Sequence, residues 1–150
     1  MLVNADELIT ALESSDGEVQ WYLDLTNGAI IPVFSDLIDE EENEAMADAV
    51  ETQPERFVPI EPIGSHEAFR IMEAFVSTLP AGTPADRLSL ALGQRHPFRV
   101  FKDALLEWPP IREQWFRFHH ARMREHAQDW LTGNQLEFTL TDRSVSSLEA

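Results

Sequence analysis

Cysteine is absent from the 150-residue chain, and several classes of site are absent with it. Disulfides, thiolate metal centres and a cysteine nucleophile are all excluded. No apolar run approaches the roughly 18 residues that a membrane-spanning helix needs. The start of the sequence also lacks the basic and apolar segments of a signal peptide. We therefore expect a cytoplasmic protein without a membrane span.

Positive charge is scarce in the first half of the sequence. Residues 1–67 contain 17 Asp and Glu but only one base, Arg56, whereas residues 68–150 contain 10 acidic and 10 basic residues. The whole net charge of −16 therefore belongs to the first half. Such a surface repels nucleic acid and anionic membranes, so we expect neither as a direct partner. It either serves solubility or attracts a basic protein.

A β-hairpin is the clearest local pattern. Apolar and polar residues alternate over 19–26, Asn27-Gly28 follows, and a second strand-like run covers 29–34. This arrangement predicts a two-residue type I′ turn. A turn of that length fixes the register, with Leu25 opposite Ile30, Leu23 opposite Pro32 and Trp21 opposite Phe34.

The remaining patterns complete the expected fold. Residues 56–61 predict a third strand and residues 136–141 a fourth, while helical patterns occur at 4–13, 36–51 and over most of 65–131. Pro32 and Pro59 belong on edge strands because proline has no N–H to donate. We expect an α+β fold in which a small antiparallel sheet of three or four strands, with the hairpin 19–34 at its centre, packs with four to five helices.

Residues 1–150 are expected to form a single domain. Its parts are an acidic region of helix and sheet over 1–67, a helical region over 68–131, and a tail over 132–150 with an extra strand. No repeat, low-complexity tract or dividing linker is present.

Polar residues interrupt the apolar face of the helix predicted over 109–131. His119, Arg122 and His126 fall among its aromatic residues at the helical spacing. They either line a cleft that holds an anionic ligand, or pair with one another and with loop carbonyls, as buried polar groups must. The seven-residue spacing of the histidines does not fit a zinc helix.

Two further motifs resemble metal sites and lack a required residue. His66-Glu67 begins a metalloprotease-like helix, but the position of the second histidine is taken by Arg70. Residues 36–44 have the acid density of a calcium loop without its glycine. We therefore expect no metal and no cofactor.

A small basic group lies near aromatic residues in the second half. Arg95, Arg99 and Lys102 accompany Phe98 and Phe101, and helical spacing places Arg99 and Lys102 on the solvent side. The group contacts phosphate, pairs with the acidic half of the chain, or is an ordinary solvated surface, and the last two are favoured. No glycine-rich phosphate loop accompanies it.

Several segments in this order resemble the bacterial uncharacterised protein family 0158 of the UPF series. They are Trp21 to Gly28, Glu55 to Ile60, Phe98 to Leu105, Trp115 to Phe118, and Trp130-Leu131. The resemblance covers about residues 4–131 and implies a bacterial protein, but no activity, substrate or cofactor. It also marks Asp24, Arg99 and Lys102 as pattern residues that core packing does not explain. The family's phenylalanine–lysine motif has two adjacent bases, and here Val100 takes the second place.

Three functional hypotheses follow. The first is a non-catalytic interaction or regulatory protein that binds a basic protein through its acidic half. The second is a small hydrolase or ligand-binding domain that uses His119, Arg122 and His126. The third is an inhibitor that imitates nucleic acid. No catalytic constellation is assembled in the sequence, so an enzyme is the less favoured class, and a homo-oligomer is compatible with all three.

Overall fold

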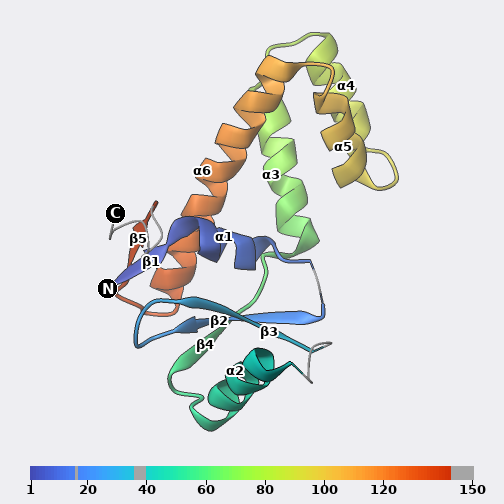
Figure 1. Ribbon diagram of the computed structural model, residues 1–150. Coiled ribbons are helices and arrows are strands. Elements are labelled where there is room, and N and C mark those ends of the chain that lie inside the picture. Colours follow the sequence, from blue (N-terminus) through green and yellow to red (C-terminus); the bar gives the residue numbers. More distant parts are fainter. Residues whose placement is uncertain (16, 36–39, 143–150) are drawn as a thin grey trace. The chain divides into compact units, whose positions relative to one another are not determined.

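The computed structural model describes residues 1–15, 17–35 and 40–142, and these residues form an α+β fold (Figure 1). The chain packs as two compact units. Unit 1 comprises residues 1–62 and 124–150, and unit 2 comprises residues 63–123. The single-domain organisation stays a prediction.

A three-stranded antiparallel sheet is the centre of unit 1. Its strands are β2 (Val19–Asp24), β3 (Ile30–Phe34) and β4 (Phe57–Ile60), in the order β3-β2-β4. The predicted sheet and its central strand are therefore confirmed. Pro32 and Pro59 lie on the two edge strands, where a missing N–H breaks no bond to β2.

The predicted register of the hairpin is wrong by two residues. Leu23 pairs with Ile30 and Trp21 with Pro32, so the connection is a longer turn over residues 25–28. The cause is the Asp24 carboxylate, whose Oδ1 accepts hydrogen bonds from the N–H and the hydroxyl of Thr26 at 2.9 and 2.7 Å. This local bonding starts the turn before Asn27. A shift of two keeps every side chain on its predicted face.

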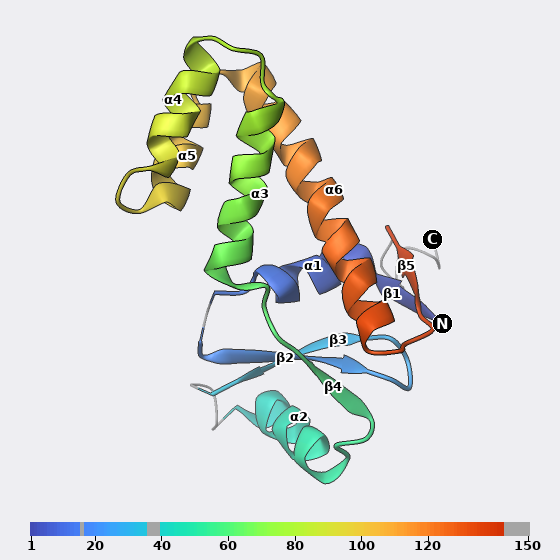
Figure 2. The same ribbon diagram turned by 180° about the vertical axis from the view of Figure 1, so that it is seen from behind.

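Helices cover both faces of this sheet. Helix α1 (Ala5–Glu13) lies on one face and α2 (Glu41–Thr52) on the other (Figures 1 and 2), and both contact β3. Asn4 caps α1, since its side-chain oxygen accepts a hydrogen bond from the Glu7 N–H at 2.8 Å. Residues 36–39, with which the predicted acidic helix begins, lie outside the described residues.

The predicted strand near the C-terminus does not join the main sheet. Strand β5 (Thr139–Thr141) pairs in parallel with β1 (Leu2–Asn4) in a separate two-stranded sheet. Gly28, at the hairpin tip, lies against β1 with a φ of +77°, and a Cβ there would stand 2.2 Å from the Leu2 carbonyl oxygen. The turn therefore needs glycine for its conformation and for this close approach.

Unit 2 is helical. It contains α3 (Gly64–Thr78), α4 (Thr83–Leu92), α5 (Pro97–Leu105) and the first part of α6 (Pro109–Gly133). Its core is aromatic: the Trp115 ring lies edge-on to Phe75 and to Phe101, at centroid distances of 5.4 and 5.0 Å. Helix α6 continues into unit 1, where Ala127 and Leu131 are buried.

The described residues contain six helices, one more than the largest number expected. Helix α6 also runs two residues past its predicted end. Gly133 is still helical, and the left-handed residue that ends the segment is Gln135, with a φ of +59°. None of the described helices is both long and apolar enough to cross a bilayer.

Candidate functional site

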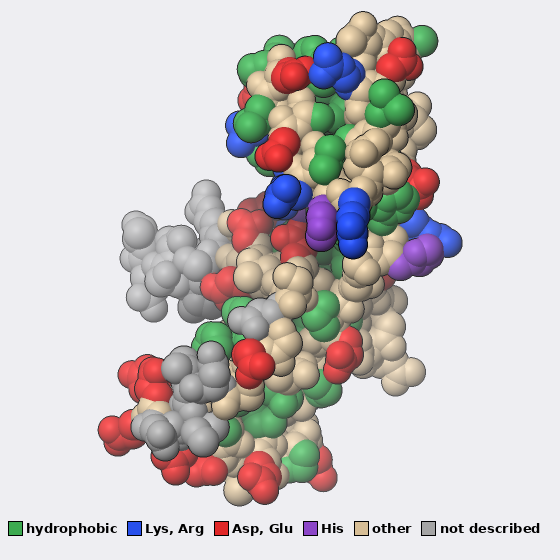
Figure 3. Space-filling view, turned by 90° about the vertical axis from the view of Figure 1, so that its right-hand side faces the viewer, with side chains coloured by type: hydrophobic (Ala, Val, Ile, Leu, Met, Phe, Trp, Pro, Cys, Tyr) green, Lys and Arg blue, Asp and Glu red, His purple; other side chains and the backbone are tan. Residues whose placement is uncertain are grey.

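Helix α2 carries a stripe of acidic side chains on its outer surface. Glu41, Glu44, Asp48 and Glu51, here called the acidic stripe, follow one another at spacings of three and four residues and are all exposed. Residues at these spacings lie on one side of a helix, and ten residues of helix extend for about 15 Å. Figure 3 shows Asp and Glu side chains gathered around α2.

No base neutralises the acidic stripe within the described part of the chain, where none of its four carboxylates forms an ion pair. Glu41 and Glu44 gain some stabilisation from the N-terminal end of the helix dipole. Like charges three and four residues apart nonetheless destabilise a helix by about 0.2–0.5 kcal/mol per pair. Positive charge from a partner would remove this repulsion.

Asn43, on another side of α2 from the stripe, attaches this helix to the sheet. Its side-chain oxygen accepts a hydrogen bond from the Phe34 N–H at 2.8 Å, and its side-chain amide donates to the Phe34 carbonyl at 2.7 Å. The Asn43 side chain thus occupies the place of a further strand beside β3. It is the buried residue of α2, so this contact aims the acidic stripe away from the sheet.

Charge is divided between the two units more sharply than between the halves of the sequence. Residues 1–62 and 124–150 contain 21 Asp and Glu but three Lys and Arg, whereas residues 63–123 contain six acidic and eight basic residues. Unit 1 therefore carries the whole negative excess, and unit 2 is slightly basic.

Asp24 is buried and bonded on both carboxylate oxygens. Arg56 binds it in a bidentate manner, with Nε 3.0 Å from Oδ1 and Nη2 2.8 Å from Oδ2, and Thr26 supplies two more donors to Oδ1. Only 2 % of the Asp24 side chain is exposed. This candidate therefore joins β2 to the residue that precedes β4, and both of its carboxylate oxygens are engaged within the protein.

The bonding of Asp24 changes its acidity. The hydrogen bond from Arg56 lowers the pKa of the Asp24 carboxyl from 3.8 to about 2, with help from Thr26 and against the opposing effect of burial. The same contact raises the pKa of Arg56. Both groups stay charged at neutral pH, so the arrangement fits a structural ion pair rather than a proton donor or acceptor.

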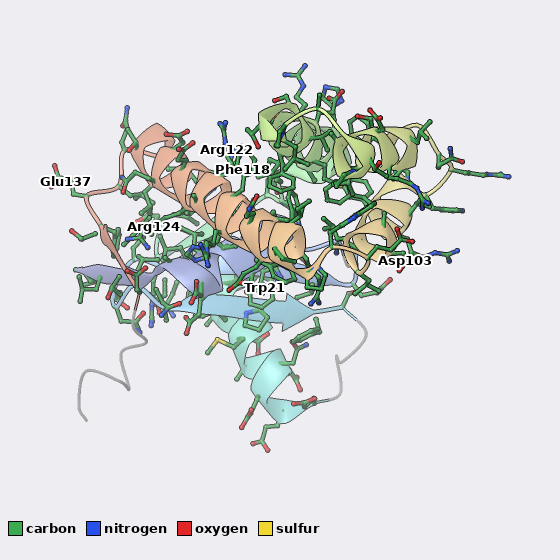
Figure 4. All side chains as sticks on the ribbon, turned by 90° about the horizontal axis from the view of Figure 1, so that it is seen from above. Trp21, Asp103, Phe118, Arg122, Arg124 and Glu137 are labelled. Atoms are coloured by element: carbon green, nitrogen blue, oxygen red, sulfur yellow. The ribbon has the colours of Figure 1, made fainter. Side chains whose placement is uncertain are left out.

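The three candidates on α6 are differently placed. His119 is half-buried, and its ring lies 5.1 Å from that of Trp115. Arg122 is exposed with its guanidinium 5.1 Å from the Phe118 ring (Figure 4), so it lies outside the buried face to which the spacing assigned it. His126 is half-buried in unit 1. All three make further interactions.

Arg99 and Lys102 lie together on the exposed side of α5, as their spacing predicts. Phe101, between them in sequence, is fully buried against Trp115. Arg99 and Lys102 therefore lie on the exposed side of a helix that the buried Phe101 ring attaches to the core of unit 2.

No metal-binding cluster is assembled in the described residues. They contain no group of three or more His, Asp and Glu placed to hold a metal ion. An apolar hollow in unit 2 is lined by the α3–α4 connection together with Ile111 and Gln114, and none of the candidate residues borders it. The acidic stripe is thus the strongest candidate site.

The sequence did not reveal the roles of two residues: Asn43, which attaches the helix of the acidic stripe, and Arg56, which pairs with Asp24. Nothing in the sequence separates Asn43 from an ordinary polar helix residue, because its bonds are to backbone atoms of a strand nine residues away. Arg56 did carry a signal. It is the only base among the first 67 residues, and a buried carboxylate in that region has to find a cation.

Comparison with known proteins identifies relatives over nearly the whole chain. A UPF0158 protein of Pseudomonas aeruginosa is 31 % identical over 137 residues, which cover 91 % of this chain and 86 % of that protein. UPF0158 proteins of Chlamydia trachomatis and Chlamydia pneumoniae are 27 % and 25 % identical over 143 residues, or 95 % of this chain. The chain spans only 43 % and 44 % of the length of these two chlamydial proteins. No solved structure matches the chain.

The family model for the uncharacterised proteins called UPF0158 matches residues 1–149. The match includes the segment after Gly133, which lay beyond the resemblance seen in the sequence. The chain therefore belongs to the uncharacterised protein family UPF0158.

Proposed function

We propose that this chain is a non-catalytic interaction protein that binds a basic surface of another protein through the acidic stripe of α2. The proposal rests on the absence, among the residues that the structure describes, of ion pairs to the acidic stripe. Four exposed carboxylates follow one side of a helix, and within the described residues no base of the chain pairs with them.

The electrostatics of unit 1 favour such a partner. With 21 acidic and three basic residues, the unit generates a negative potential that speeds the approach of a basic protein and repels an acidic one. Docked Lys or Arg side chains would also relieve the repulsion along α2. A protein surface with several Lys or Arg side chains, spaced like the carboxylates along α2, would meet both conditions.

The manner in which α2 is attached also suits a docking helix. Asn43, whose side chain leaves α2 on a different side from the stripe, fixes the helix to β3. The stripe is thus presented on a supported backbone, and little conformational entropy is lost when a partner binds. Binding is expected to be sensitive to salt, because exposed charges are screened over about 8 Å at physiological ionic strength.

A pull-down with paired variants tests the proposal. The stripe variant is Glu41→Gln, Glu44→Gln, Asp48→Asn and Glu51→Gln. The control removes the same charge from exposed acids elsewhere, with Glu→Gln substitutions at 55, 61, 73 and 137. Wild type and control should enrich the same basic protein at low salt and release it at high salt, while the stripe variant should lose it.

Circular dichroism checks that both variants keep their helices. The proposal is contradicted if no basic protein is enriched by the wild type, or if the stripe variant enriches the same protein as well as the control does. If the enriched protein binds DNA and free DNA competes for the site, the acidic stripe acts by imitating nucleic acid.

A further inference from the structure

Unit 2 exposes apolar side chains on its outer pair of helices. Leu90 on α4 is 65 % exposed, and Leu106, directly after α5, is 61 % exposed. Exposed leucines are unremarkable when scattered singly, but apolar groups gathered on one surface mark an interaction site.

The contacts of α4 and α5 place the two leucines on one outer surface. The helices pack against each other, α4 contacts α3, and Phe101 of α5 packs on Trp115 of α6. Leu88 and Phe101 point into this core, so the sides opposite them face outward. An ion pair of 3.4 Å between Arg87 and Glu107 joins the helices across that outer side.

Basic residues border the leucines on the same outer side of α5. Arg99, Lys102 and Leu106 follow one another at spacings of three and four residues, and all three are exposed. No ion pair engages Arg99 or Lys102 within the part of the chain that the structure describes. Asp103, which directly follows Lys102 in α5, is also exposed (Figure 4). Figure 3 shows hydrophobic side chains interspersed with charged ones over unit 2.

We infer that this outer surface of α4 and α5 is a second docking site, which takes an acidic protein segment carrying apolar side chains. The leucines supply apolar area, and the unpaired cations select the sign of the partner's charge. Unit 2 is the slightly basic part of a chain whose other unit holds the whole negative excess, so the two docking sites prefer partners of opposite charge.

The composition of the surface favours a protein segment over nucleic acid. Two leucines and two carboxylates, Asp103 and Glu107, lie among the cations. Carboxylates repel a phosphate backbone, which needs a larger run of bases to bind at physiological salt. An acidic segment with leucine or phenylalanine would match both the apolar and the basic groups.

Selection from a displayed library of random peptides tests this inference with a defined probe. Panned on the wild type, the library should yield peptides rich in Asp and Glu with interspersed apolar residues. Arg99→Glu with Lys102→Glu should weaken the selected peptides about tenfold or more, as expected for losing and reversing two exposed charges. Leu90→Ser with Leu106→Ser should weaken the peptides without changing the charge.

A matched control reverses two exposed bases outside this surface, Arg70→Glu and Arg117→Glu, and should leave peptide affinity within about twofold. Circular dichroism verifies that every variant is folded. The inference is overturned if no acidic apolar peptide is selected, or if the selected peptides bind the Arg99 and Lys102 variant as tightly as the control. It is also overturned if a second copy of the chain occupies the surface, seen as self-association that the leucine variant abolishes.

Discussion

Replacement of Asp24 by asparagine removes a buried charge that holds the sheet of unit 1 together. Asp24 Oδ1 and Oδ2 bind Arg56 at 3.0 and 2.8 Å, and the pKa of the carboxyl falls from 3.8 to about 2. At 1.36 kcal/mol per pKa unit, this shift corresponds to about 2 kcal/mol of stability at neutral pH. Asparagine also points an amide N–H at the guanidinium donors. We therefore expect Asp24→Asn to lower the free energy of unfolding by about 2–4 kcal/mol.

The direction of the pKa shift determines how the stability lost in Asp24→Asn depends on pH. A carboxyl whose pKa is lowered by folding stabilises the protein above its unfolded value of 3.8, and that contribution disappears as the pH falls through about 2. The difference between wild type and Asp24→Asn should be constant from pH 8 to 5 and shrink between pH 4 and 2. Urea unfolding followed by circular dichroism measures it.

The control is Asp103→Asn, because this carboxylate is exposed on α5. It should change stability by less than about 0.5 kcal/mol. The reasoning is refuted if Asp24→Asn costs no more than the control, or if its cost at pH 2.5 equals its cost at pH 7.

Three further substitutions test other contacts. Gly28→Ala places a Cβ 2.2 Å from the Leu2 carbonyl at a φ of +77°; it should cost at least about 1 kcal/mol and speed amide exchange in β1, with unchanged exchange as the contrary result. Asn43→Ala leaves the part-buried N–H and carbonyl of Phe34 unpaired, for a loss of about 1–3 kcal/mol in urea unfolding; a neutral effect would mean that α2 is held otherwise. Phe101→Ala removes a fully buried ring and should cost about 3–5 kcal/mol in thermal unfolding, whereas Phe116→Ala, at a half-exposed position, should cost far less.

The faces of the hairpin could be predicted from the sequence, but its register could not. Alternation with a period of two assigns Leu23 and Trp21 to one face wherever the turn begins. The register depends on which residues close the turn. Asp24 decides this by bonding to Thr26 rather than leaving Asn27-Gly28 to close the hairpin. The sequence predicted the Asn27-Gly28 turn alone and did not reveal that the Asp24 side chain would bond to Thr26.

The strand with which β5 pairs could not be predicted from the sequence, for a different reason. A strand of three residues has few side chains to specify a partner, and β1, which it joins, lies more than 130 residues away. Parallel pairing over that distance leaves no local pattern, since no turn connects the strands.

Helical spacing was accurate for α5 and misleading for α6. On α5, a short helix with one buried side, it placed Arg99 and Lys102 on the exposed surface. On α6, the buried residues Trp115, Met123, Ala127 and Leu131 lie at multiples of four residues. Because 3.6 residues complete a turn, that row moves around the helix and leaves Arg122 exposed.

The acidic half could be recognised from the sequence, whereas its organisation could not. The count of acids shows an excess over residues 1–67. That four of these acids form one stripe depends on where α2 begins, and that the stripe faces away from the sheet depends on Asn43. A single asparagine bonded to a strand backbone has no periodic signature.

The dissociation constant of the captured basic partner, measured against salt concentration by titration calorimetry, tests the central claim most directly. For the wild type, affinity should fall steeply between 50 and 500 mM salt, because exposed charges are then screened. The stripe variant at Glu41, Glu44, Asp48 and Glu51 should bind about tenfold or more weakly at 50 mM salt, with a shallower salt dependence. Equal affinity and an equal salt slope for wild type and variant would contradict the proposed role of α2.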